Sequence, residues 1–173
     1  MLVTENDNRE IVLVHEIIRR VDGMDEISAN RESELIYTKQ PFLISLILGY
    51  RVDLKTENFE LVTKCIFVIW EYFKSRDEVL RTKIIEQQFD RIHKRNFHLV
   101  RYFESETNEG KIELLKFDLG KLNAKALYVG VMNILRIPNS LRKGESETIG
   151  ILLVGMKCLI ECFEELTQNA YTP

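Results

Sequence analysis

Glycine and proline are scarce in this sequence, with 8 and 3 residues among 173. An all-β fold needs many tight turns, and these two residue types supply most of them. Their scarcity therefore argues against a β-sandwich or barrel and favours helices. The length is typical of one domain, and a chain of this size can bury a substantial hydrophobic core. We therefore expect one all-α domain over residues 1–173.

Cysteine is also scarce, and the sequence holds an odd number of them. A secreted disulfide framework needs more cysteines, arranged in pairs. The first ten residues are too polar for a secretory signal, and no acceptor for N-linked glycosylation occurs. The most apolar run, residues 149–160, contains Lys157 and is shorter than a membrane span. These absences predict a cytoplasmic protein that does not enter a membrane.

An excess of charge of one sign is missing as well. The chain has 24 basic and 27 acidic side chains and a formal net charge of −3. So small a net charge creates no global field that would attract a phosphate backbone. The composition thus argues against nucleic acid as the main partner, and anion binding would require a local basic patch.

Motifs for nucleotide binding and for covalent catalysis are absent. The sequence has no P-loop, no Gly-x-Gly-x-x-Gly and no Gly-x-Ser-x-Gly, and no motif assigns it to a family. His15 falls within the apolar stripe of the first predicted helix. Either His15 or His93, with acids from other helices, offers a starting point for an enzymatic site, although no nucleophile can be tied to His15.

Metal and redox sites find equally little support. Asp90 and His93 have the spacing of a helical metal-binding pair, but no second copy of the pair occurs, so we interpret them as surface residues. Cys158 and Cys162 lie one helical turn apart, yet a structural zinc site needs four ligands. We therefore interpret both cysteines as core residues, like Cys65, and expect neither a metal nor a cofactor.

Hydrophobic periodicity predicts about six helices. The three at 57–75, 121–136 and 147–167 are apolar on several sides, which predicts an interior position for them and a central one for the last. The segment 106–120 fits either a short helix or a strand, and residues 1–7 and 169–173 are candidates for flexible ends. The expected helices are 8–22, 41–49, 57–75, 77–105, 121–136 and 147–167, with a short additional one that Ser28 or Asn30 caps and that ends at Tyr37.

Two groups of side chains are candidate binding residues. Basic residues at helical spacing would form a strip for an anion or a protein partner along the helix 77–105. Aromatic residues of the three interior helices would line a pocket for a small apolar ligand. The strip consists of Lys83, Arg91, Lys94, Arg95, His98 and Arg101. The pocket consists of Phe67, Trp70, Phe73, Tyr128 and Phe163.

The leading hypothesis is a non-enzymatic helical interaction module that acts through protein contacts, with homodimerisation as one option. It depends on the lack of chemical motifs and on apolar surface beyond what one stripe per helix requires. A first alternative is a binder of a small apolar or amphiphilic ligand between helices. A second is an enzyme with a histidine–acid site that the motif search does not recognise.

Overall fold

The computed structural model describes residues 5–105, 107–136 and 146–168, and all regular elements in these ranges are α-helices. The all-α prediction is therefore confirmed. The predicted count is too low, because the described residues form nine helices rather than about six. The helices are α1 Glu5–Asp22, α2 Glu26–Lys39, α3 Pro41–Asp53, α4 Thr56–Phe73, α5 Asp77–Arg81, α6 Glu86–Ser105, α7 Asn108–Lys121, α8 Lys125–Arg136 and α9 Ser146–Gln168.

The helix expected over 77–105 is broken into α5 and α6 by residues 82–85. The buried side chain of Gln40 fixes this break from the junction of α2 and α3. Its amide nitrogen donates to the carbonyls of Val79 and Thr82, each at 2.7 Å, and its oxygen accepts from the Ile84 amide at 2.9 Å. Gln40 thus pairs backbone groups that a continuous helix would pair within itself.

The segment 106–120, open between helix and strand, forms helix α7 from residue 108 on. Its first turn is capped by Thr107, whose hydroxyl accepts a hydrogen bond from the Gly110 amide at 3.2 Å. The cap predicted for the short second helix is wrong, because Asp25 caps α2 and accepts from the Ser28 amide at 2.8 Å. Of the expected flexible ends, residues 5–7 belong to α1 and the others lie outside the described residues.

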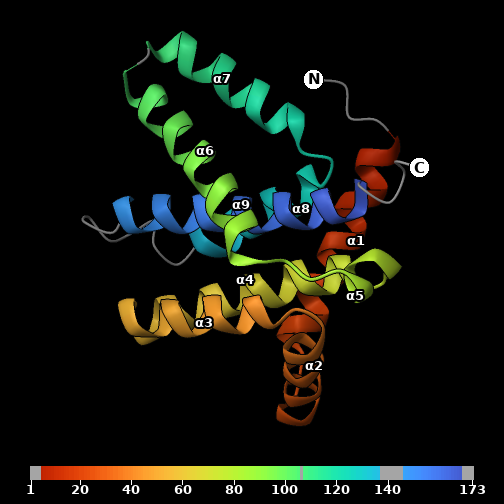
Figure 1. Cartoon of the computed structure of the whole chain (residues 1–173). Helices are drawn as coiled ribbons and strands as arrows, with labels where there is room; N and C mark the ends of the chain where they lie inside the picture. The colour runs from red at the N-terminus through yellow and green to blue at the C-terminus, as the bar shows by residue number, and fades with distance from the viewer. Residues whose placement is uncertain (1–4, 106, 137–145, 169–173) are drawn as a thin grey trace.

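The core lies where α4, α8 and α9 meet (Figure 1). Helix α1 packs on α4 and α8, α6 packs on α9, and α3 packs on α4. The central position predicted for the last helix is met only in part: α9 contacts α4, α5, α6 and α8, but Gly150, Ile151 and Gln168 near its ends are exposed. None of the helices in the described ranges combines the length and the hydrophobicity that crossing a bilayer requires.

Two glycines allow close helix contacts in this core. A Cβ atom at Gly130 of α8 would lie 2.8 Å from the Cγ1 atom of Val14 in α1. A Cβ atom at Gly155 of α9 would overlap the hydroxyl oxygen of Tyr50 in α3. Because the missing side chains leave room for these neighbours, both glycines contribute to packing that offsets their low helix propensity.

Candidate functional site

The basic strip predicted on one helix is divided by the fold. Lys83 precedes α6 and is exposed, as are Lys94 and His98 on the helix itself. Arg91 and Arg95 turn instead toward α9, where their guanidinium groups contact Glu165 at 2.6 Å and Glu161 at 3.0 Å. The sixth residue, Arg101, lies over the ring of Phe97 at 4.9 Å. Two of the six side chains therefore contribute to the α6–α9 contact.

Four of the five aromatic residues predicted to line a pocket are buried in the core, and the fifth, Tyr128, is partly buried and packs against it. Phe73 and Phe163 stack on each other with their ring centroids 4.9 Å apart. Trp70 is fully buried, and its indole nitrogen donates to a carboxylate oxygen of Glu32 at 2.9 Å. None of the five lines either of the two hollows described below.

The three cysteines, His15 and His93 lie apart from the two hollows described below. All three cysteines are buried and free, as the sequence suggested, and burial raises the pKa of Cys158 to about 11 and that of Cys65 to about 12. Such thiols stay protonated at neutral pH, whereas nucleophilic or metal-binding cysteines are thiolates. His15 is exposed rather than part of an apolar face. His93 stacks against the ring of Phe89 with the centroids 5.9 Å apart.

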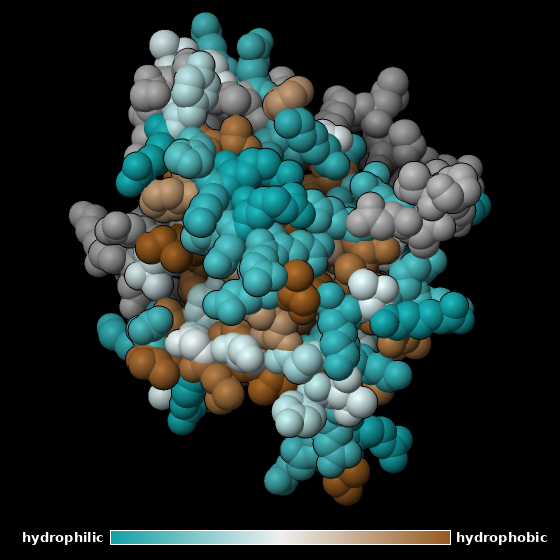
Figure 2. All heavy atoms as spheres, viewed as in Figure 1, coloured by the Kyte–Doolittle hydropathy of each residue, from teal (hydrophilic) through white to brown (hydrophobic). Residues whose placement is uncertain are grey.

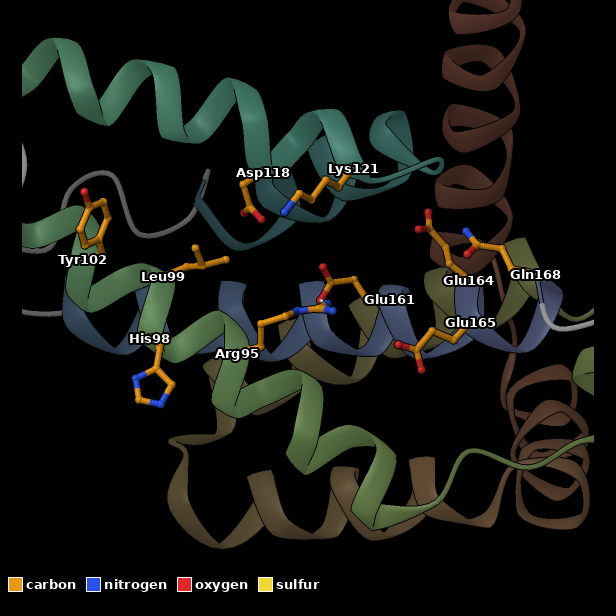
Figure 3. Close-up of a pocket in the computed structure, with 10 residues that line it drawn as sticks. All are labelled: Arg95, His98, Leu99, Tyr102, Asp118, Lys121, Glu161, Glu164, Glu165 and Gln168. Carbon is orange, nitrogen blue, oxygen red and sulfur yellow. The ribbon is translucent and has the colours of Figure 1, made fainter.

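The larger of the two hollows is a polar cleft of about 640 Å³ between α6, α7 and α9 (Figure 3). Acids of α9 form one wall, and Arg95, Leu99 and Tyr102 of α6 form the facing one. Asp118 and Lys121 of α7 complete it. We call these lining residues the polar cleft; they are Arg95, His98, Leu99, Tyr102, Asp118, Lys121, Glu161, Glu164, Glu165 and Gln168.

The amine of Lys157, only 5% exposed, lies beside this cleft and has three acceptors. Its Nζ atom lies 2.6 Å from the side-chain oxygen of Asn96, 2.8 Å from Glu161 and 3.0 Å from Asp118. The first two contacts are hydrogen bonds that the amine donates, and the third is an ion pair. The contact with Asp118 joins α7 to α9, and that with Asn96 joins α6 to α9. The group therefore holds three helices together.

Glu164, the most deeply buried acid of the cleft, caps a helix. One of its carboxylate oxygens accepts from the backbone amides of Asn123 at 2.9 Å and Ala124 at 2.7 Å, just before α8 begins. Burial raises the pKa of this carboxyl, and the two amide hydrogen bonds lower it by less. A helix start carries unpaired amides and a partial positive charge, which a carboxylate satisfies.

The polar cleft thus holds charges that already have partners within the chain. Glu161, Glu164, Glu165 and Asp118 each pair with an amine, a guanidinium or a backbone amide. Among the described residues, no group of three or more His, Cys, Asp or Glu side chains is arranged to hold a metal ion. The contacts of these acids therefore account for the packing of α6, α7, α8 and α9.

The second feature is an apolar surface on α3 (Figure 2). Helix α3 buries Leu43 and packs Leu46, Ile47 and Tyr50 against the core. On the opposite side, hydrophobic side chains lie open to solvent: Leu48 is 59% exposed and Val52 is 84% exposed. Figure 2 shows brown, hydrophobic residues gathered over this helix. We define the outer face of α3 as Ser45, Leu48, Gly49 and Val52, all of which are exposed.

A shallow groove borders this face where α3 meets α2. It has a volume of about 490 Å³ and places Ile44 of α3 next to Tyr37 of α2, which is 68% exposed. Glu34 supplies the charged side chain of the lining. We call it the α2–α3 groove; its residues are Ser33, Glu34, Tyr37, Thr38 and Ile44. Face and groove together make an exposed surface rich in apolar side chains.

The sequence analysis placed no binding residue on the helix 41–49 and so missed the outer face of α3. The signal is present, since residues 41–50 are apolar at most positions and a helix one stripe wide needs fewer. The role of Lys157 was missed too. A lysine within an otherwise apolar helix signals that acceptors from other segments surround it. Which segments supply them depends on the fold.

Comparison with known proteins adds no assignment. A scan against protein-family models and searches of curated proteins and of solved structures find no match to this chain. Any proposal about its function therefore depends on its own residues.

Proposed function

We propose that this chain is a non-enzymatic interaction module that binds a protein partner through the outer face of α3 and the adjoining α2–α3 groove. The observation that carries the proposal is the exposure of Leu48 and Val52 on a face without a charged residue. The exposed charged side chains of α3, Arg51 and Asp53, lie at the C-terminal end of this face. Contiguous apolar surface of this kind is typical of interaction sites.

The energetic reason is the free energy of transferring these side chains out of water. Fully burying a leucine or valine side chain contributes about 1.5–3 kcal/mol. Leu48, Val52 and Tyr37 are each more than half exposed, so a partner that covers them gains most of this contribution. Interfaces derive their affinity chiefly from a few such central residues, surrounded by a polar rim.

The polar cleft supports the proposal indirectly. Its acids and bases are engaged in contacts that hold α6, α7 and α9 together. The tight stacking of Phe73 on Phe163 offers no specific support for an apolar ligand between the helices.

The test compares binding partners of wild-type protein with those of a charged variant. Leu48→Lys combined with Val52→Lys places two ammonium groups on the outer face of α3. The matched control is Val129→Lys with Ile151→Lys, which charges two exposed apolar positions on α8 and α9. Proteins retained by the wild-type chain in cell extract, and the chain itself, are then titrated as purified partners against all three versions.

We expect a partner whose affinity falls by at least about tenfold, the equivalent of 1.4 kcal/mol, with the α3 variant alone. Circular dichroism of both variants confirms that they remain helical. If every partner binds the α3 variant and the wild type equally, the proposal is wrong. The same holds if no purified partner, including the chain itself, binds at all.

A further inference from the structure

We infer that the partner is a second copy of this chain, and that the outer faces of two α3 helices pair antiparallel across a twofold axis near Leu48 and Gly49. This inference rests on the proposed function and names the occupant of the same surface. A twofold interface must be complementary to itself, because each copy presents the same residues. The outer face of α3 meets this condition in its shape and in its charge.

The outer face of α3 has projecting side chains next to a shallow depression. Leu48 and Val52 project from the helix, whereas Ser45 and Gly49 lie beside them on the same face and have small side chains or none. The distance between packed helices depends on the side chains at their contact, so small residues permit a close approach. In an antiparallel pair, Leu48 of each copy lies near Gly49 of the other.

Gly49 has no role in the packing of its own chain. A Cβ atom added there would meet no atom within 4 Å, whereas a Cβ atom at Gly130 or Gly155 would collide with Val14 or Tyr50. Glycine in a helix interior lowers the stability of the helix. At Gly130 and Gly155 a neighbouring helix uses the space that is gained. At Gly49 the space faces solvent, where a second copy can use it.

The charges at the two ends of α3 select the antiparallel orientation. Arg51 and Asp53 are both exposed on either side of Val52 near the C-terminal end, and the Arg51 guanidinium lies 4.9 Å from the centre of the Phe59 ring. Glu34 is exposed in the α2–α3 groove near the N-terminal end. Antiparallel pairing brings Arg51 of one copy toward Glu34 of the other. It also places Val52 of one copy beside the α2–α3 groove of the other. Parallel pairing would instead keep Arg51 of one copy and Glu34 of the other at opposite ends of the pair. Antiparallel helices also oppose their dipoles favourably.

The first experiment measures association of the purified full chain by sedimentation velocity over a wide range of concentrations. The variants are Gly49→Ala, Val52→Lys and, as the matched control, Gly150→Ala. Gly150 also lies in a helix, and a Cβ atom there would meet nothing within 4 Å. We expect a concentration-dependent dimer of wild type and of Gly150→Ala, and dissociation constants raised at least about tenfold in the other two.

Thermal unfolding at concentrations where the chain is monomeric separates association from folding. Alanine is the better helix former, so Gly49→Ala and Gly150→Ala should each raise Tm by about 2–4 °C. A substitution that stabilises the monomer while weakening the dimer has no explanation within a single chain. Equal dimerisation of Gly49→Ala and wild type would overturn the inference, as would a wild-type monomer at every concentration.

Cysteine crosslinking tests the orientation. In the antiparallel pair, Leu48→Cys lies near the twofold axis and should form an intermolecular disulfide on oxidation. Val52→Cys should not, because the two copies of residue 52 are separated by about 10 Å along the helix axes at 1.5 Å per residue. The native cysteines are buried and give little background. Crosslinking at both positions would show parallel pairing and contradict the proposed arrangement.

The outcomes separate this inference from the proposed function. A chain that stays monomeric, but binds another purified protein in an α3-dependent manner, refutes the second copy and leaves the interaction module standing. A chain that neither dimerises nor binds any protein through α3 refutes both.

Discussion

The inner side of α9 buries ionisable side chains, whereas the outer face of α3 exposes apolar ones. On α9, Lys157 and Glu164 are almost completely buried although both are ionisable. On α3, Leu48 and Val52 are exposed although both are apolar. Each buried charge has its partners within the chain, whereas the apolar face has no cover among the described residues.

The difference indicates which of the two regions has all of its contacts within the chain. Burying a charge without a partner costs several kcal/mol, so a stable fold must supply a partner for each buried charge. Exposing a few apolar side chains costs much less and is compatible with a folded chain. The α9 region thus reports on how this chain folds, and the α3 region is where we propose that it binds a partner. The predictions below test this distinction, beginning with the largest effect.

Replacing Lys157 by alanine should have the largest effect. The change leaves Asp118, Glu161 and Asn96 without their common donor. Breaking a buried ion pair on one side costs about 3–5 kcal/mol. We expect a loss of this size in the free energy of unfolding, measured by urea denaturation followed by circular dichroism.

The matched control for Lys157 is Arg81→Ala, which breaks the exposed ion pair between Arg81 and Asp77. An exposed pair contributes about 0–1 kcal/mol, so this variant should unfold almost like the wild type. Equal effects of the two alanine substitutions would mean that the contacts of Lys157 do not hold α6, α7 and α9 together.

Gly155→Ala should have an intermediate effect and the opposite sign to Gly49→Ala. A methyl group at Gly155 overlaps the hydroxyl of Tyr50, and overpacking of this kind costs about 1–3 kcal/mol. A methyl group at Gly49 meets nothing and should stabilise the monomer by about 0.5–1 kcal/mol. Tyr50→Phe removes the overlapping oxygen. The double variant Gly155→Ala with Tyr50→Phe should therefore recover most of the lost free energy of unfolding. If it recovers none, the close contact between residues 155 and 50 is not the cause of the loss.

The smallest effect concerns the pH dependence that Glu164 contributes. Burial raises the pKa of its carboxyl in the folded protein, helped by the charge of Glu161 and opposed by Arg76. A raised pKa disfavours the charged form in the folded state, so the carboxylate lowers stability at neutral pH. This loss is relieved as the pH falls through the folded pKa toward the unfolded value near 4.5.

Glu164→Gln isolates this contribution, because glutamine keeps an oxygen that can accept from the amides of Asn123 and Ala124. Measured between neutral pH and the unfolded value, the stability of wild type relative to Glu164→Gln should rise as the pH falls. Carboxyls that do not interact with Glu164 change both proteins alike and cancel in the difference. A difference that is constant with pH, or that moves in the other direction, would contradict the assignment.

Helix positions could be predicted from the sequence wherever one apolar stripe repeats along a segment. The stripes of α1, α4, α8 and α9 are of this kind, and their predicted and observed ranges overlap closely. The prediction failed at residues 82–85, where the pattern is compatible with a continuous helix. The helix is interrupted there because the side chain of Gln40, distant in the sequence, forms hydrogen bonds with three backbone groups at the break.

The candidate sites were harder to predict for a related reason. The spacing of Arg91 and Arg95 shows that they share a face of a helix, but not that Glu165 and Glu161 lie opposite. Leu48 and Val52 are apolar like their neighbours in α3, so sequence does not distinguish the side that packs from the side that remains exposed.

By itself, the sequence determined that this chain is helical and which segments carry apolar stripes. Both properties depend on composition and on spacing within a few residues, which are local. Only the tertiary structure decided that Lys157 joins three helices, that Glu164 caps α8 and that one face of α3 remains open. These outcomes depend on which distant segments come together, because a charge is stable inside only where other helices bring it partners, and an apolar face is buried only where another helix covers it.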